Sequence, residues 1–174
     1  MNWKLALPIA LFAPAVAFAQ GKPTDPQIAG IVVTANQIDV EAGKLAKSKS
    51  KNKEVKDFAQ QMITDHTAVN KQAAALAKKL GVKPEPSDTS KSLKQGAQQN
   101  VAKLKTLKGG AFDKAYIEHE VAYHQQVLDA IDKVLVPDAQ NAELKGLIEN
   151  VRPAIAAHLE HAQHVQADLA KSKK

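Results

Sequence analysis

The sequence predicts an all-α fold: a bundle of four long helices and one shorter helix. Good helix formers, chiefly Ala, Lys, Leu, Gln and Glu, dominate the chain, whereas the alternating apolar runs typical of strands are scarce. Four long stretches carry apolar residues spaced alternately three and four apart, the pattern of a helix with one buried face. Proline- and glycine-rich segments separate these stretches, which indicates where the helices end.

The start of the chain, MNWKLALPIALFAPAVAFAQ, has the pattern of a cleaved signal peptide. A basic residue precedes a short apolar run, and the small-x-small tripeptide Ala17-Phe18-Ala19 ends it. The run is interrupted by prolines and is shorter than the roughly 20 apolar residues that a membrane span needs. We therefore expect cleavage after Ala19, a periplasmic or secreted protein, and a single domain over residues 20–174.

The composition argues against several classes of function. The chain has no cysteine, so it carries neither a disulfide nor a lipid-anchored cysteine. The net charge of +6 comes almost entirely from lysine, because Arg152 is the only arginine, and aromatic residues make up 4% of the chain. Sequence-specific nucleic-acid binding favours arginine forks and stacking rings, so we expect no nucleic-acid partner. No later segment is apolar enough to span a membrane.

The first two helices have clear start and stop signals. Thr24-Asp25-Pro26-Gln27 predicts the start of the first helix, with Thr24 as the cap, Gln27 reaching back and proline in the first turn. This helix is expected to end near residue 48. The second is expected to run from about residue 52 to Gly81.

The second half of the chain predicts three further helices. A turn-rich stretch, VKPEPSDTS, precedes a shorter helix over about residues 88–108, which Gly109-Gly110 is expected to end. The fourth helix is expected over about 111–136 and to end at Pro137. The last spans about 141–171 and contains Pro153, where we expect a kink unless the helix begins there.

Four long helices with a shorter one between the second and fourth suggest two antiparallel hairpins joined by a long crossover. This is the topology of a ferritin-like four-helix bundle. An up-and-down array of five helices is the competing arrangement.

Three of the six histidines fall on the apolar stripes of three different helices. His66 replaces an apolar residue in the second helix, His124 in the fourth and His158 in the last. The last helix also carries His161 and His164 in the run HLEHAQHV, but these step away from its stripe and are expected on the flank or surface.

Three inward-facing imidazoles require partners inside the bundle, since burial disfavours the charged ring and leaves two nitrogens to satisfy. The nearest carboxylates in the pattern are Glu41, Asp65 and Glu120. One interpretation is that each histidine is satisfied separately by a carboxylate, a tyrosine or a backbone carbonyl. The other is a transition-metal site for zinc, iron or copper, with ligands drawn from these three carboxylates and the three histidines.

The expected positions of the histidines along the bundle axis leave two possible sets of metal ligands. Measured from a turn at Pro137, His158 lies deeper in the bundle than His124 and closer to the level of Glu120. A set of His66, His158 and Glu120 with Glu41 is therefore an alternative to a set that uses all three histidines.

The sequence favours a protein that is not an enzyme. A carboxylate-bridged di-iron site takes Glu-x-x-His from two helices, and no such motif exists here, since Glu120 and His124 are four apart. There is also no Gly-x-Ser-x-Gly and no glycine-rich phosphate loop. The lysine-rich run Lys44–Lys56 is expected to be a solvated loop, or else to make weak contacts with anionic polymers of the cell envelope.

Several segments together resemble a family of exported bacterial proteins known as domain of unknown function 4142. They are Glu41 followed by GKLA at 43–46, VKDFAQQMITDH at 55–66, FDKAYIEHEVAYHQQVL at 112–128, and PAIAAHL at 153–159. The resemblance covers roughly residues 25–168 and implies export and a ferritin-like fold, but no activity. It marks as recurring polar positions Glu41, Asp65, His66, His124 and His158.

The leading hypothesis is an exported helical bundle whose interior polar cluster binds a transition metal for storage, sensing or structure. The alternative is a metal-free envelope stress or interaction module, in which the cluster only specifies packing. A third reading is an acid sensor, because buried neutral histidines favour unfolding as the pH falls.

Overall fold

The computed structural model describes residues 21–171, and over this range it contains helices and connecting turns but no strand. The predicted signal peptide lies outside the described residues, so its cleavage stays a prediction. Among the described helices, none is long and apolar enough to cross a membrane.

Within residues 21–171, five helices of substantial length follow one another, and a π-helical turn and one short helix lie between the last two. They are α1 (Asp25–Lys49), α2 (Lys53–Leu80), α3 (Asp88–Thr106), α4 (Gly109–Ala130), the π-helix η1 (Ile131–Leu135), α5 (Val136–Asp138) and α6 (Ala142–Lys171). The predicted bounds of the first three are correct to within two residues.

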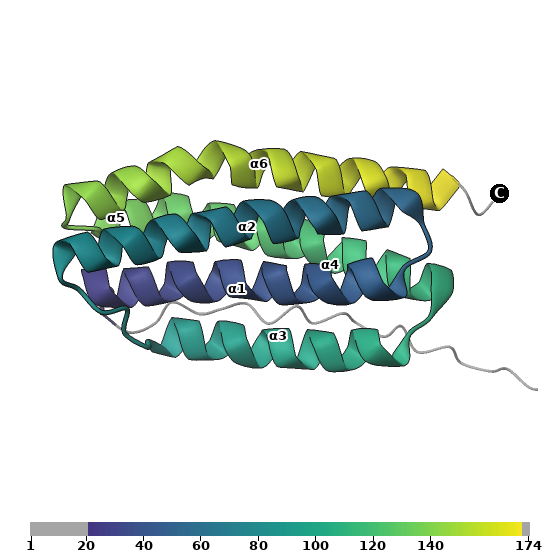
Figure 1. Ribbon diagram of the computed structural model, residues 1–174, viewed down its shortest axis with the longest axis horizontal. Coiled ribbons are helices and arrows are strands. Elements are labelled where there is room, and N and C mark those ends of the chain that lie inside the picture. The colour runs from purple at the N-terminus through teal and green to yellow at the C-terminus, as the bar shows by residue number, and fades with distance from the viewer. Residues whose placement is uncertain (1–20, 172–174) are drawn as a thin grey trace, which may run out of the picture.

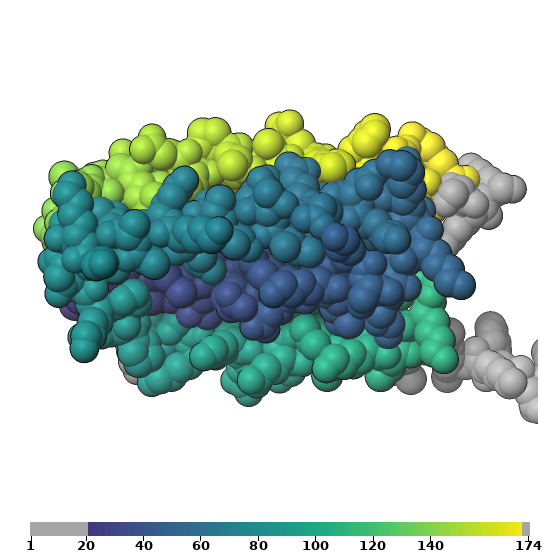
Figure 2. All heavy atoms as spheres, viewed as in Figure 1, coloured from purple at the N-terminus to yellow at the C-terminus, as the bar shows by residue number. Residues whose placement is uncertain are grey.

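The helices form two antiparallel hairpins joined by a crossover helix (Figure 1). One hairpin is α1 with α2, and the other is α4 with α6; α3 runs back along the outside of α1 to connect them. Of the residues in α3, only Ser90 and Leu104 are buried, so this helix covers the bundle without contributing much to its core. In the space-filling view, α2 and α3 leave only a strip of α1 visible (Figure 2). The structure therefore confirms the four-helix bundle with a crossover and not the five-helix array.

Local signals in the sequence set the ends of α1 and α2. Thr24 accepts a hydrogen bond from the backbone N–H of Gln27, and the Gln27 side chain accepts one from the backbone N–H of Thr24, which confirms the predicted capping box. The side chain of Asn52 caps α2, and Gly81 ends it in the left-handed conformation, with φ of 65°.

The connection between α2 and α3 lies directly on α1 at Gly30. The backbone N–H of Glu85 donates to the carbonyl oxygen of Pro26, at 2.8 Å. A Cβ atom at Gly30 would lie 2.0 Å from the carbonyl oxygen of Glu85, which is far inside van der Waals contact. Only glycine allows this approach of two backbones.

The turn into the last helix comes later than predicted. The helical course passes through η1 and beyond Pro137 to Asp138, because proline is tolerated in the first turn of α5. The Asp25 carboxylate then accepts hydrogen bonds from the backbone N–H groups of Gln140 and Asn141, each at 2.9 Å. This contact ties the turn before α6 to the start of α1.

The last helix is continuous across its proline. Since α6 runs from Ala142 to Lys171, Pro153 lies within it and does not begin it. The ribbon of α6 curves along its length (Figure 1), and a proline within a helix removes one backbone hydrogen bond.

Two apolar clusters fill the bundle, one toward each end. The first includes Ile28, Leu135 and Ile148, and the second includes Phe58, Phe112 and Val165. The buried histidines belong to neither cluster. The polar side chains therefore form a layer across the middle of the bundle, between the two apolar clusters.

Candidate metal centre

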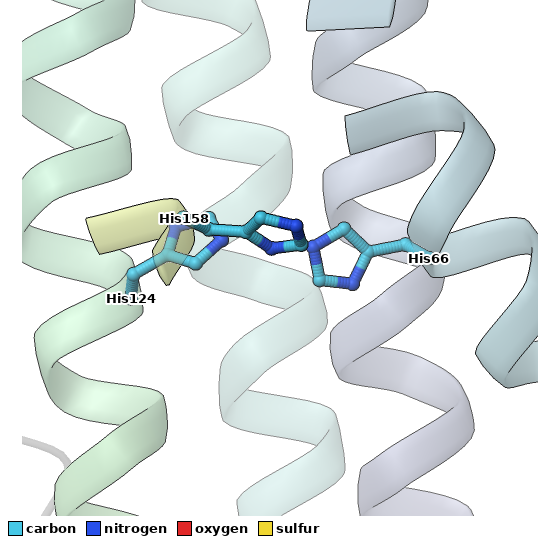
Figure 3. A group of neighbouring side chains, drawn as sticks. All are labelled: His66, His124 and His158. Atoms are coloured by element: carbon cyan, nitrogen blue, oxygen red, sulfur yellow. The ribbon is translucent and has the colours of Figure 1, made fainter. Parts of the chain in front are cut away.

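The three predicted inward-facing histidines meet in the middle of the bundle (Figure 3). Their ring centroids are 5.7 Å apart for His66 and His124, 5.1 Å for His66 and His158, and 5.5 Å for His124 and His158. One ring nitrogen from each lies within 4.8 Å of the others, and all three side chains are buried. We refer to His66, His124 and His158 as the histidine cluster.

The later turn explains why His124 and His158 lie at one level. His124 and His158 are equally far along the chain from Asn141, which immediately precedes α6, whereas measurement from Pro137 placed them apart. The predicted depth offset is therefore wrong, because the helix does not end at the proline.

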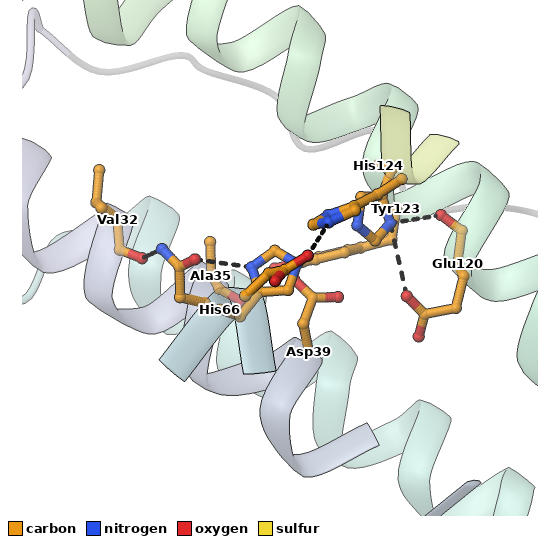
Figure 4. A network of polar contacts seen from close by, with 10 residues as sticks. Val32, Ala35, Asp39, His66, Glu120, Tyr123 and His124 are labelled. Atoms are coloured by element: carbon orange, nitrogen blue, oxygen red, sulfur yellow. Dashed lines mark hydrogen bonds and ion pairs between the residues drawn. The ribbon is translucent and has the colours of Figure 1, made fainter. Parts of the chain in front are cut away.

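Each histidine donates one ring N–H to a fixed acceptor. In His66, Nδ1 lies 2.7 Å from the side-chain oxygen of Asn36, whose own amide group donates to the carbonyl oxygen of Val32 at 2.7 Å (Figure 4). The second bond orients the Asn36 amide with its oxygen toward His66. The proton of a neutral His66 is therefore on Nδ1, and Nε2 carries a lone pair.

The same division of roles holds in the other two rings. Nδ1 of His124 lies 2.9 Å from the backbone carbonyl oxygen of Glu120 and donates to it. Nε2 of His158 lies 2.9 Å from the Asp65 carboxylate, so in this ring the free nitrogen is Nδ1. The nitrogens left without a hydrogen-bond partner are Nε2 of His66, Nε2 of His124 and Nδ1 of His158.

Burial keeps the cluster neutral. It lowers the pKa of His66 to about 2, with further lowering by His124 and His158. Burial also lowers the pKa of His124 to about 4, although its bond to the Glu120 carbonyl opposes this shift. The pKa of His158 is lowered by burial too, against the opposing effect of Asp65. At neutral pH three unprotonated nitrogens therefore face one another, and this is the state that binds a metal ion.

A buried carboxyl pair, Asp39 and Glu120, adjoins the cluster (Figure 4). One oxygen of Asp39 lies 3.6 Å from Nε2 of His66, and one oxygen of Glu120 lies 3.5 Å from Nδ1 of His124. Burial raises the pKa of Asp39, with partial compensation by a hydrogen bond to Glu120. Burial and then the charge of Asp39 raise the pKa of Glu120. Burial therefore favours the protonated form of these carboxyl groups when no cation is near.

The comparisons with known proteins identify the family. The family model described as "Domain of unknown function (DUF4142)" matches residues 11–165. The chain belongs to this family. No curated protein matches it. Among solved structures, this DUF4142 protein is similar to CopM in its Cu(II)-bound form, with a TM-score of 0.64 and 14% sequence identity over 85% of this chain and 99% of that one. At this identity the likeness shows the shared fold alone.

The structure divides the six predicted site residues into three groups. His66, His124 and His158 form the cluster, with Glu120 beside it. Asp65 lies on the outer side of His158, where it is an acceptor and not an inward ligand.

The expected position of Glu41 beside the histidines, inside the bundle, is wrong. Its side chain is exposed and accepts a hydrogen bond from Gln37, at 2.9 Å. The helical phase puts Asp39, two residues earlier, on the inward side instead.

The DUF4142 chain also contains two buried site residues that the sequence reasoning missed, Asn36 and Asp39. A signal for them exists, because α1 has a second stripe with alternating spacings of four and three. Its members are Val32, Asn36, Asp39, Gly43 and Ala46, all of which are buried. A helix that contacts neighbours on two sides buries two stripes, and only the more apolar one was recognised.

Proposed function

We propose that this protein binds one transition-metal ion through Nε2 of His66, Nε2 of His124 and Nδ1 of His158. The observation that carries the proposal is the convergence of three buried ring nitrogens that have no hydrogen-bond partner. Leaving such groups unpaired costs stability, whereas a cation at their centre would satisfy all three at once.

The surroundings of the cluster match those of histidine metal sites. Each ligand histidine in such sites donates its other N–H to an oxygen, which fixes the ring and its tautomer. Here Asn36, the Glu120 carbonyl and Asp65 accept these bonds. The carboxylate of Asp39 lies near enough to His66 to offer an oxygen as a fourth ligand after loss of its proton.

Three neutral imidazoles and one carboxylate favour zinc or copper over magnesium or calcium, which prefer oxygen ligands. Iron also accepts imidazole and belongs in the same test. Because the structurally similar CopM was solved with Cu(II), copper is the first ion to examine. In an exported protein, this site would hold the metal for storage, sensing or structure.

The test is elemental analysis of residues 20–174, purified without an affinity tag or chelator. We expect about one copper or zinc ion per chain after metal is added back and excess is removed. His66→Ala, His124→Ala and His158→Ala should each lose the metal. His164→Ala is the matched control, since its side chain is 75% exposed on α6 and lies outside the cluster.

Two results would contradict the proposal. One is a wild-type protein that stays free of metal after add-back, which would mean that the cluster only specifies packing. The other contrary result is full metal content in all three cluster variants, which would place the ion elsewhere. Circular dichroism of each variant separates loss of ligand from loss of fold.

A further inference from the structure

A pocket of about 290 Å³ adjoins the histidine cluster and extends to the surface of the bundle. At its inner end it is lined by His66, His124 and Asp39, and on its outer side by the exposed Gln126 and Lys133. We call this space the entry pocket. It lies between α1, α4, η1 and α6, beside the start of α3.

The walls of the entry pocket are apolar. They include Ile31, Val127, Val134, Leu135, Ile148 and Ile155. Two polar side chains near the inner end are already engaged: Asn36 with His66, and the Tyr123 hydroxyl as a donor to the Ala35 carbonyl at 3.2 Å. The buried lining atoms that have no hydrogen-bond partner are Nε2 of His66, Nε2 of His124 and Oδ1 of Asp39.

The charges at the mouth cancel one another. Lys133 and Asp129 form an ion pair at 3.1 Å, so neither is left to attract a charged ligand. A charged molecule would lose its hydration in the pocket without gaining a counter-charge from the apolar walls. The walls therefore favour neutral molecules.

The π-helical turn η1 forms part of the outer wall. It contributes Ile131, Val134 and Leu135 to the lining, in addition to Lys133 at the mouth. Single π turns within α-helices occur frequently at functional sites, because the wider turn displaces side chains from their regular positions. Here the π turn lies in the wall of the pocket that leads to the cluster.

We propose that the entry pocket binds an uncharged, mainly apolar molecule that carries one metal-coordinating donor atom. This inference rests on the proposed function, since the donor would occupy a coordination position that the three histidines leave open, either beside Asp39 or in its place. The apolar part would contact the pocket walls, and the volume, near the lower end of the roughly 300–1,000 Å³ of ordinary ligand pockets, limits it to a small aromatic or aliphatic group.

The test compares two probes with the same donor, 4-phenylimidazole and imidazole, on Cu(II)-loaded protein. Binding is followed by the visible absorption and electron paramagnetic resonance of Cu(II), and the metal content is measured again after each titration. We expect 4-phenylimidazole to bind at least about tenfold more tightly, because burial of the phenyl ring adds apolar contact. Imidazole gains only the coordination bond.

A variant that fills the pocket distinguishes the contribution of the pocket walls to binding from the contribution of the metal ion. Val134→Trp should remove the advantage of 4-phenylimidazole over imidazole and leave the copper content unchanged. Val136→Trp is the matched control, since Val136 is also half-buried next to η1 but does not line the pocket. Ala130→Phe, at another lining position, repeats the test if Val134→Trp fails to fold.

The outcomes distinguish this inference from the proposed function. If the two probes bound copper-loaded wild type with equal affinity, the proposed role of the entry pocket would be wrong, and the proposed metal site would be unaffected. An unchanged preference in Val134→Trp and Ala130→Phe would also overturn the role of the entry pocket. Failure of the wild type to bind any metal would overturn the proposed function, and the inference with it.

Discussion

At the scale of single residues, the outer partner of each histidine decides which nitrogen faces the centre. His158 presents Nδ1 because Asp65 accepts from its Nε2, whereas His66 and His124 present Nε2 because their Nδ1 groups have acceptors on α1 and α4. The spacing of residues along each helix predicts that the three rings lie inside the bundle. It does not predict their tautomers, because these depend on which hydrogen-bond acceptors lie next to each ring in the folded protein.

Removal of the Asn36 acceptor should weaken metal binding without removing a ligand. In Asn36→Leu, His66 loses the group that fixes its ring and tautomer, so we expect metal affinity to fall by about 10–100-fold. Competition with a chromophoric chelator measures the change. Gln37→Leu, an exposed neighbour on the same helix, should leave the affinity unaltered, and equal losses in the two variants would contradict this role for Asn36.

Replacement of a cluster histidine by an apolar residue should separate stability from metal binding. In the metal-free protein, His124→Leu removes a buried nitrogen that lacks a partner, so the free energy of unfolding should be unchanged or higher. His124→Ala should instead be destabilised by about 2 kcal/mol or more through the cavity it leaves. Urea denaturation with a chelator present measures both, and a lower stability for leucine than for alanine would refute the argument.

At the scale of the elements, close packing of backbones sets the position of the helices around the cluster. The α2–α3 connection lies against Gly30, and the Asp25 carboxylate holds the turn that precedes α6. The sequence predicted the caps of α1 and α2 from residues a few positions apart. It did not predict these two contacts, because they join segments far apart in the chain.

Two glycine substitutions should have opposite effects on stability. Gly30→Ala would place a Cβ atom against the Glu85 backbone, which must move, so we expect a loss of about 2 kcal/mol or more. Gly96→Ala, in the middle of α3, meets nothing within 4 Å and should gain up to about 1 kcal/mol from higher helix propensity. Urea midpoints measure both, and equal effects would show that the loop does not lie on Gly30.

At the scale of the whole molecule, burial lowers the pKa of three buried histidines and raises the pKa of two buried carboxyl groups. The pKa of His119, outside the cluster, is also lowered to about 4, by burial and then by Lys103. These groups make the stability of the metal-free bundle depend on pH. The histidines and the carboxyl groups contribute in opposite directions, and their balance decides whether stability rises or falls with pH.

Stability of the metal-free protein should fall on acidification. The unfolded chain binds protons on its histidines near pH 6.5, whereas folded His66 and His124 stay neutral down to about 2 and about 4. The histidine contribution is therefore complete above about pH 7 and is lost as the pH falls through 6.5. Each net proton taken up on unfolding changes the free energy by about 1.4 kcal/mol per pH unit.

The carboxyl pair acts in the opposite direction. Because the pKa values of Asp39 and Glu120 are raised, the folded state binds protons on this pair more readily than the unfolded state does, and this cost to stability shrinks on acidification. Because the histidines outnumber the two carboxyl groups, the free energy of unfolding should still fall as the pH falls. Urea midpoints at pH 7.5, 6 and 5 with a chelator test it, and a flat profile would be incompatible with neutral buried histidines.

The sequence by itself determined the all-α class, most helix ends and the three inward-facing histidines, and it favoured the crossover topology without excluding an array of five helices. These features are local, since they follow from caps, breakers and the spacing of apolar residues along single helices. Only the tertiary structure decided that the three histidines meet at one level, that Asp39 and not Glu41 joins them, and that an apolar pocket reaches them. The level depends on a helix that continues past Pro137 into a turn held by Asp25, and the choice of carboxylate depends on α1 having two buried sides. Contacts between distant segments set both, and no pattern within one helix encodes them.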